Sequence, residues 1–102
     1  MNFIARLIHR WSKTQVFATS VGVLPYPREQ AEDLAVRYRM TIQPASFLDE
    51  GVRPTDKWTA RSMHVSSITV YAHGPSIYDA VLKCAFTVQQ VEHLVSEGDN
   101  LL

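Results

Sequence analysis

In the last third of the chain, a run of β-branched residues gives way to apolar positions spaced every three to four residues. Val65–His73 favours a strand, which Gly74–Pro75 ends. Ser76 then stands where a helix N-cap belongs, with Asp79 in the capping-box position, and Gly98 is a suitable stop. The apolar positions of the predicted helix are Ile77, Ala80, Val81, Cys84, Ala85, Val88, Val91 and Val95.

The N-terminal segment Asn2–Lys13 has the pattern of a short amphipathic helix. One face is apolar and the other is mainly basic. The apolar residues are Phe3, Ile4, Leu7, Ile8 and Trp11, and the polar ones are Arg6, His9, Arg10 and Lys13. We expect the apolar face to pack on the core, because a core this small needs those side chains. The alternative is that the helix lies on a membrane or a nucleic acid.

The middle of the chain predicts shorter elements. Gln15–Leu24 is apolar enough for an extended segment, and a helix beginning near Pro27 would bury Ala31, Leu34, Ala35 and Tyr38. Met40–Leu48 contains Pro44, which restricts it to an edge strand or an irregular segment. Asp49–Lys57 is a polar loop, and Trp58–Met63 either forms a separate strand or begins the strand that follows.

These elements predict an α+β fold, with a small antiparallel or mixed sheet of about three strands packed against two or three helices. The length of 102 residues and the hydrophobic share of 46% fit one compact domain over residues 1–102, with a polar loop around residues 49–57.

Charge is balanced overall but unevenly distributed. Ten basic and ten acidic side chains cancel, which argues against a dedicated nucleic-acid binder. Residues 1–28 carry four cations and no acid, whereas residues 74–102 carry four acids and one cation. This asymmetry either steers a partner or makes the two terminal segments complementary to each other.

The single cysteine, Cys84, belongs to the apolar stripe of the last helix and is expected to be a small core residue. One cysteine forms no internal disulfide, which fits a reducing compartment. The chain has no apolar run of membrane-spanning length, and its N-terminus lacks the apolar core of a secretory signal. We therefore expect a cytoplasmic protein.

No motif predicts catalysis, a cofactor or a metal site. The four histidines lack the closely spaced ligand pairs of zinc sites. There is no Gly-x-Ser-x-Gly elbow and no glycine-rich phosphate loop. We predict that the protein is not an enzyme; a small enzyme using His73 or His64 is the less favoured alternative.

Binding to a partner is the leading functional prediction. The predicted contact residues are basic or aromatic and lie in the N-terminal segment, in the polar loop and just after the loop: Arg6, Arg10, Arg53, Lys57, Trp58 and Arg61. The competing interpretation of Trp58 is that it returns to the core.

A second set of candidates lies where the last strand meets the last helix. Tyr71, His73 and Ser76 could bind a small anionic or nucleotide-like ligand at the helix N-terminus. In the simpler interpretation, Ser76 caps the helix and His73 is a solvated strand end.

We therefore expect a small non-enzymatic protein-interaction module. In size and lack of motifs the chain resembles the small accessory proteins of phages, many of which inhibit a host macromolecule. A small-ligand or nucleic-acid-binding domain is the alternative, although the chain lacks the aromatic-rich strand of RNA-recognition motifs and the basic helix start of double-stranded RNA-binding domains. Spare sheet edges also make a homo-oligomer plausible.

Overall fold

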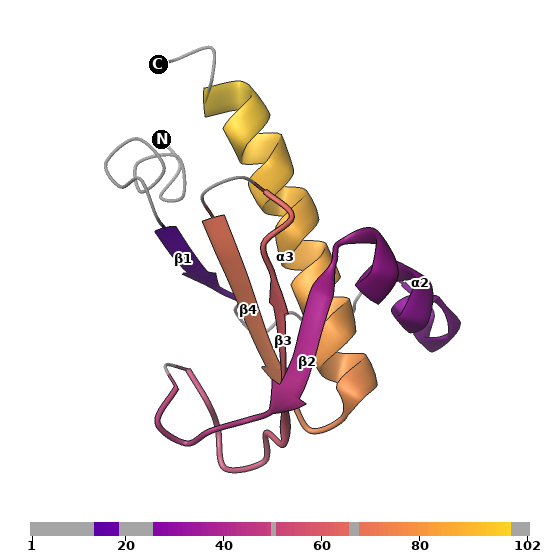
Figure 1. The fold of residues 1–102 in the computed structure, drawn as a ribbon, viewed down its shortest axis with the longest axis vertical. Helices are drawn as coiled ribbons and strands as arrows, with labels where there is room; N and C mark the ends of the chain where they lie inside the picture. Colours follow the sequence, from indigo (N-terminus) through magenta and orange to yellow (C-terminus); the bar gives the residue numbers. More distant parts are fainter. Residues whose placement is uncertain (1–13, 19–25, 50, 66–67, 99–102) are drawn as a thin grey trace.

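Four strands form one mixed sheet in the computed structural model, which describes residues 14–18, 26–49, 51–65 and 68–98. The strands are β1 (Thr14–Phe17), β2 (Met40–Pro44), β3 (Trp58–Ser62) and β4 (Ile68–Gly74). Their order in the sheet is β1-β4-β3-β2. The pairs β2–β3 and β3–β4 are antiparallel, and β1 runs parallel to β4 (Figure 1).

The helices pack against one face of this sheet. A short 3-10 helix, η1 (Arg28–Gln30), leads into α2 (Ala31–Arg37), and α3 (Ile77–Gly98) follows β4. The long helix α3 lies against β4 and β3, while α2 contacts both α3 and the edge strand β2. The predicted α+β fold is confirmed, with four strands in place of about three.

The core lies between α3 and the helix-facing side of the sheet. Side chains alternate between the two faces along each strand, so β4 contributes Ile68, Val70 and Ala72 to the core. On α3 the buried stripe is Ala80, Val81, Cys84, Ala85, Val88 and Val91. The predicted core face of α3 is therefore confirmed at these positions, whereas Ile77 is 41% exposed at its start.

The turn from β4 into α3 depends on Gly74 and Ser76. A Cβ atom at Gly74 would lie 2.8 Å from the backbone nitrogen of Ala80, so only glycine allows the strand to approach the helix this closely. The Asp79 backbone N–H donates to Ser76 Oγ at 3.2 Å, and the Ser76 hydroxyl donates to Asp79 Oδ2 at 2.9 Å. The predicted cap is thus present.

The helix α2 is fixed to the rest of the fold through Tyr38, its C-cap residue. The Ser62 hydroxyl donates to the Tyr38 carbonyl at 2.7 Å, and Gln89 Nε2 donates to the Tyr38 hydroxyl at 2.9 Å. One residue therefore connects α2 to both β3 and α3. Of the predicted buried positions, Ala31, Leu34 and Tyr38 are confirmed, whereas Ala35 is half-buried.

Several predicted boundaries differ from the structure. The strand β4 begins at Ile68, three residues later than predicted, because Val65 lies in a bend. The described part of the predicted 15–24 segment is the short strand β1, and Trp58–Ser62 is a separate strand. Pro44 does end an edge strand.

The predicted helix Asn2–Lys13, with Arg6 and Arg10, lies outside the described residues, as do residues 19–25. Among the described helices, none combines the length and hydropathy needed to cross a bilayer.

Candidate functional site

The connection between β2 and β3, residues 45–57, is fixed at its base by the sheet. The Ala45 backbone N–H donates to the Lys57 carbonyl at 2.9 Å, and the Lys57 N–H donates to the Gly74 carbonyl at 2.9 Å. The second bond joins the base of the loop to the end of β4. The loop thus leaves the sheet from a rigid base at the end where β4 turns into α3 (Figure 1).

Two large apolar side chains project from a tight turn in this loop. The Asp49 backbone N–H donates to the Ser46 carbonyl at 2.9 Å, and the Leu48 N–H donates to Ser46 Oγ at 3.2 Å. Phe47 and Leu48 occupy the middle of this turn and are 87% and 82% exposed. We call this turn, residues 46–49, the loop tip. Its own hydrogen bonds hold both side chains away from the core.

A second turn continues the loop toward β3. The Arg53 backbone N–H donates to Asp56 Oδ2 at 2.8 Å, and the Asp56 N–H donates to the Arg53 carbonyl at 2.9 Å. Gly51, between the two turns, has a φ of +80°, which glycine adopts without strain. Both predicted loop cations, Arg53 and Lys57, have exposed side chains. The loop therefore presents apolar and charged groups together.

The structure separates the other predicted contact residues. Trp58 is half-buried, lies on the helix-facing side of β3 and packs against the core. Arg61, three residues further along the same strand, lies on the opposite face, in register with Tyr71 of β4. Arg53 and Lys57 share the loop, but Trp58 and Arg61 do not share a surface.

The sheet face opposite the helices carries an aromatic pair. The rings of Phe17 and Tyr71 stack with their centroids 5.1 Å apart and their planes at 14°. Gln15 Nε2 donates to the Tyr71 hydroxyl at 3.4 Å. On the same face Thr59 Oγ1 lies 2.7 Å from His73 Nδ1, and both residues are buried.

The three residues of the predicted ligand site therefore already have partners within the chain. Tyr71 stacks on Phe17, His73 is hydrogen-bonded to Thr59, and Ser76 is hydrogen-bonded to Asp79 as the cap of α3. The predicted solvated position of His73 is wrong, because it is 8% exposed. A ligand at Ser76 would have to share its hydroxyl with the helix cap.

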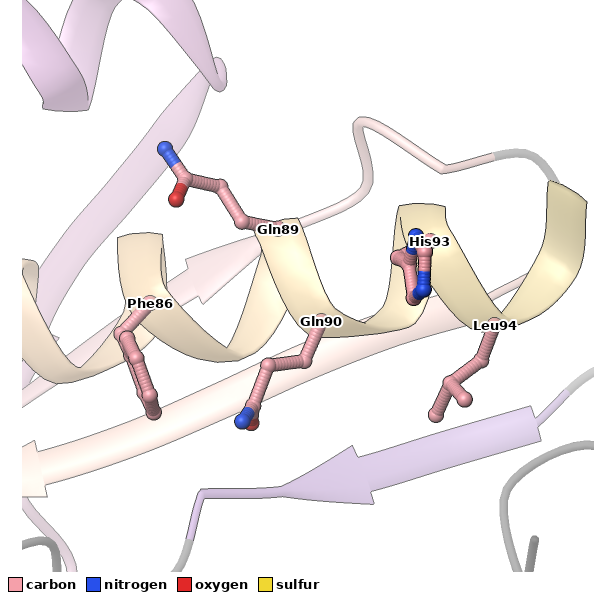
Figure 2. Close-up of a pocket in the computed structure, with 5 residues that line it drawn as sticks. All are labelled: Phe86, Gln89, Gln90, His93 and Leu94. Carbon is pink, nitrogen blue, oxygen red and sulfur yellow. The ribbon is translucent and has the colours of Figure 1, made fainter.

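A groove runs along the exposed side of α3. It has a volume of about 420 Å³ and is lined by Phe86, Gln89, Gln90, His93 and Leu94, which we call the α3 groove. Phe86, Gln90 and Leu94 point toward the β1 side of the helix, while Gln89 points toward α2 and β2 (Figure 2). The half-buried side chains of Phe86 and Leu94 make its floor mainly apolar.

The ionisable groups of the described residues form no cluster suited to a metal ion. No set of three or more His, Cys, Asp or Glu side chains in this part of the chain is placed to hold a metal ion. Burial raises the pKa of the Cys84 thiol to about 12, and its Sγ faces the Val70 carbonyl at 3.8 Å. The thiol is therefore protonated at neutral pH and is a core residue, as predicted.

Phe47 and Leu48 are the surface residues that the sequence pattern missed. The segment Met40–Leu48 predicts an edge strand or an irregular segment, and its pattern does not mark Phe47 or Leu48 as contact residues. The sequence signal that indicates a turn at this point is the pair of turn-forming residues on either side of them, Ser46 and Asp49.

Comparison with protein-family models, with curated proteins and with solved structures finds no match to this chain.

Proposed function

We propose that the protein is a non-enzymatic interaction module whose loop tip inserts into an apolar pocket of a protein partner. The observation that carries this proposal is the exposure of Phe47 and Leu48, at 87% and 82%, on a turn held by its own hydrogen bonds. Single exposed apolar residues are common on protein surfaces. Two adjacent large ones on an ordered turn are typical of an interface anchor.

The energetics favour such insertion. Burying a side chain the size of Phe or Leu stabilises a complex by about 1.5–3 kcal/mol. A turn that is already ordered loses little conformational freedom on binding, so more of that gain remains as affinity. Arg53, Lys57, Asp49 and Asp56 surround the tip in sequence and would form the polar rim of the interface.

We propose a cytoplasmic setting and modulation of the partner by occupation of its pocket. The unpaired, buried Cys84 is consistent with a reducing compartment. Occupation of a pocket on a host macromolecule is also how a small inhibitor of the phage type would act. Such a module needs no catalytic group of its own.

The first test is crosslinking from the loop tip in source cells. A photoreactive amino acid at Phe47 of the full chain is expected to capture one protein at stoichiometric yield, with or without nuclease. The same group at Val36, which is 75% exposed on α2, is the matched control and is expected to capture much less. Equal capture from both positions, or recovery of nucleic acid alone, contradicts the proposal.

Affinity for the captured partner then tests the anchors. The double substitution Phe47→Ser and Leu48→Ser is expected to weaken binding at least tenfold, with the melting temperature unchanged, because neither side chain contacts the core. Val36→Ser is the control.

The five predicted cations are tested separately, by charge reversal at Arg6, Arg10, Arg53, Lys57 and Arg61. Unchanged binding in that variant removes them from the interface.

A further inference from the structure

Among the described elements, a helix covers the sheet on one side of α3 and none lies on the other side. The helix α3 lies over β4 and β3, and α2 lies beside it toward β2. On the other side β1 pairs with β4 but has only marginal contact with α3. Packed helices lie about 10 Å apart, roughly two strand spacings, so a helix placed beside α3 on this side would lie over β1.

The side of α3 that faces this position is apolar and accessible. Phe86, Gln90 and Leu94 follow one another at four-residue spacing and point toward the β1 side (Figure 2). We propose that the α3 groove is the docking site of this chain's own N-terminal segment, residues 2–13, packed as an amphipathic helix beside α3 and over β1.

The connection of the chain favours this occupant. Thr14, the first residue of β1, aligns with Ile68, at the end of β4 farthest from the start of α3. Because α3 runs back along β4, the start of β1 lies at the Leu94 end of the groove (Figure 2). A segment that ends at Lys13 therefore reaches the groove through its last residues alone, without a long linker.

The segment also has the required length and direction. Residues 86 and 94 are about 12 Å apart along the α3 axis, and a helix of ten to twelve residues is about 15–18 Å long. Running toward Thr14, it would be parallel to α3. Ile4 would then lie near Phe86, Ile8 near Gln90 and Trp11 near Leu94.

Charge complementarity supports the same arrangement. The segment carries Arg6, Arg10 and Lys13 and no acid. The last turn of α3 carries no basic residue, so no cation of that turn faces the negative end of the helix dipole. Glu97 there is 59% exposed and lies 3.1 Å from His93 Nε2. Arg10 and Lys13, closest in sequence to Thr14, would come near this acidic end.

A disulfide test distinguishes the two faces of the segment. In the full chain, Ile8→Cys combined with Gln90→Cys is expected to oxidise within the monomer at least tenfold faster than His9→Cys combined with Gln90→Cys. The two pairs have nearly the same tether length, but only Ile8 belongs to the apolar face. The buried thiol of Cys84 stays protonated and does not compete.

Hydrogen exchange provides a measurement that does not depend on a variant. Amides 3–11 of the wild-type chain are expected to exchange at least tenfold more slowly than an unstructured peptide, and Leu94→Asp is expected to abolish that protection. Val36→Asp is the exposed control on α2.

Four results would overturn the proposal. These are equal oxidation rates of the two cysteine pairs, a crosslink found only at the mass of a dimer, wild-type amides 3–11 without protection, and protection that appears only with anionic lipid vesicles. None of these results concerns the loop tip, so the two proposals succeed or fail independently.

Discussion

Arg39 has a backbone conformation that costs stability. It follows the C-cap of α2 with a φ of 52°, in the left-handed region that glycine occupies freely and other residues rarely adopt. Its N–H donates to the Val36 carbonyl at 3.2 Å, so this conformation helps to close the helix. The strain belongs to the backbone of Arg39, so a substitution at that position can remove it.

Arg39→Gly is therefore expected to stabilise the protein by about 0.5–1 kcal/mol, because the strain lost in the folded state exceeds the added freedom of the unfolded chain. Thermal unfolding would show an increase in melting temperature of a few degrees. Arg37→Gly, two residues earlier inside the last turn of α2, is the control and is expected to lose about 1 kcal/mol. A decrease in stability for both variants would contradict the assignment of strain to Arg39.

The buried thiol of Cys84 leads to a prediction about how stability depends on pH. Its pKa is raised from 9.0 to about 12 by burial, so the protonated form is favoured in the folded state. That contribution to stability is fully present below pH 9 and is lost as the pH rises toward 12. Cys84→Ser is expected to flatten this alkaline loss in denaturant titrations across that range. At pH 8, alkylation of the wild-type thiol should follow global unfolding, and rapid labelling of the folded protein would show that the thiol is accessible.

Single residues also show why part of the candidate site could not be predicted. Ser76 was predicted as a cap from its local neighbours, and a cap depends only on such neighbours. Phe47 and Leu48 have a composition suited to a core, and their exposure depends on how the loop leaves the sheet. Trp58 and Arg61 are close in sequence, but strand alternation places them on opposite faces.

Among the elements, α3 contributes most to the core. It packs on β4 and β3 with an almost continuous buried stripe, in which Val88 and Val91 are fully buried. Tyr38 then joins α2 to this helix through Gln89. A substitution that weakens the packing of α3 is therefore expected to destabilise both helices of this layer.

Val88→Ala is expected to destabilise the protein by about 2 kcal/mol, because it removes buried methyl groups and leaves a cavity beneath α3. The matched control is Val36→Ala, the same change at a residue that is 75% exposed on α2, which should alter stability by less than about 0.5 kcal/mol. Urea titrations of both variants would check this. An equal loss of stability in the two variants would mean that burial of the side chain does not determine the free-energy cost of the substitution.

A helix or strand could be predicted from the sequence where its signals lie within one continuous segment. The helix α3 has a cap, a periodic apolar face and a stop within one continuous segment. The four residues of β1 carry little periodicity, and their partner β4 lies more than fifty residues further along the chain. Parallel pairing across that separation leaves no local pattern, so the partner of β1 could not be predicted. About three strands were predicted instead of four because the sequence of Trp58–Met63 fits either a separate strand or the beginning of the strand that follows.

At the scale of the whole molecule, the two proposed binding surfaces lie at different ends of the fold. The loop tip projects where β4 meets the start of α3, and the α3 groove lies along the later part of that helix. Segment docking in the groove and partner binding at the tip therefore need not compete. We expect charge reversal at Arg10 to change exchange protection of the N-terminal segment without changing partner affinity, and hydrogen exchange and titration of the captured partner would check the two effects separately.

The parallel pairing of β1 with β4 also has a consequence for the order of folding. The strands β2, β3 and β4 are neighbours in sequence and can form a meander early, whereas β1 must close a loop that includes about half of the chain. During synthesis β1 leaves the ribosome first and must wait for β4. Pulse-labelling during refolding is expected to protect the β3 and β4 amides before the Ala18 amide, which donates to the Tyr71 carbonyl at 2.8 Å. Until β1 arrives, the edge of β4 is open to strands of other chains, so β1 protects the nascent protein against aggregation.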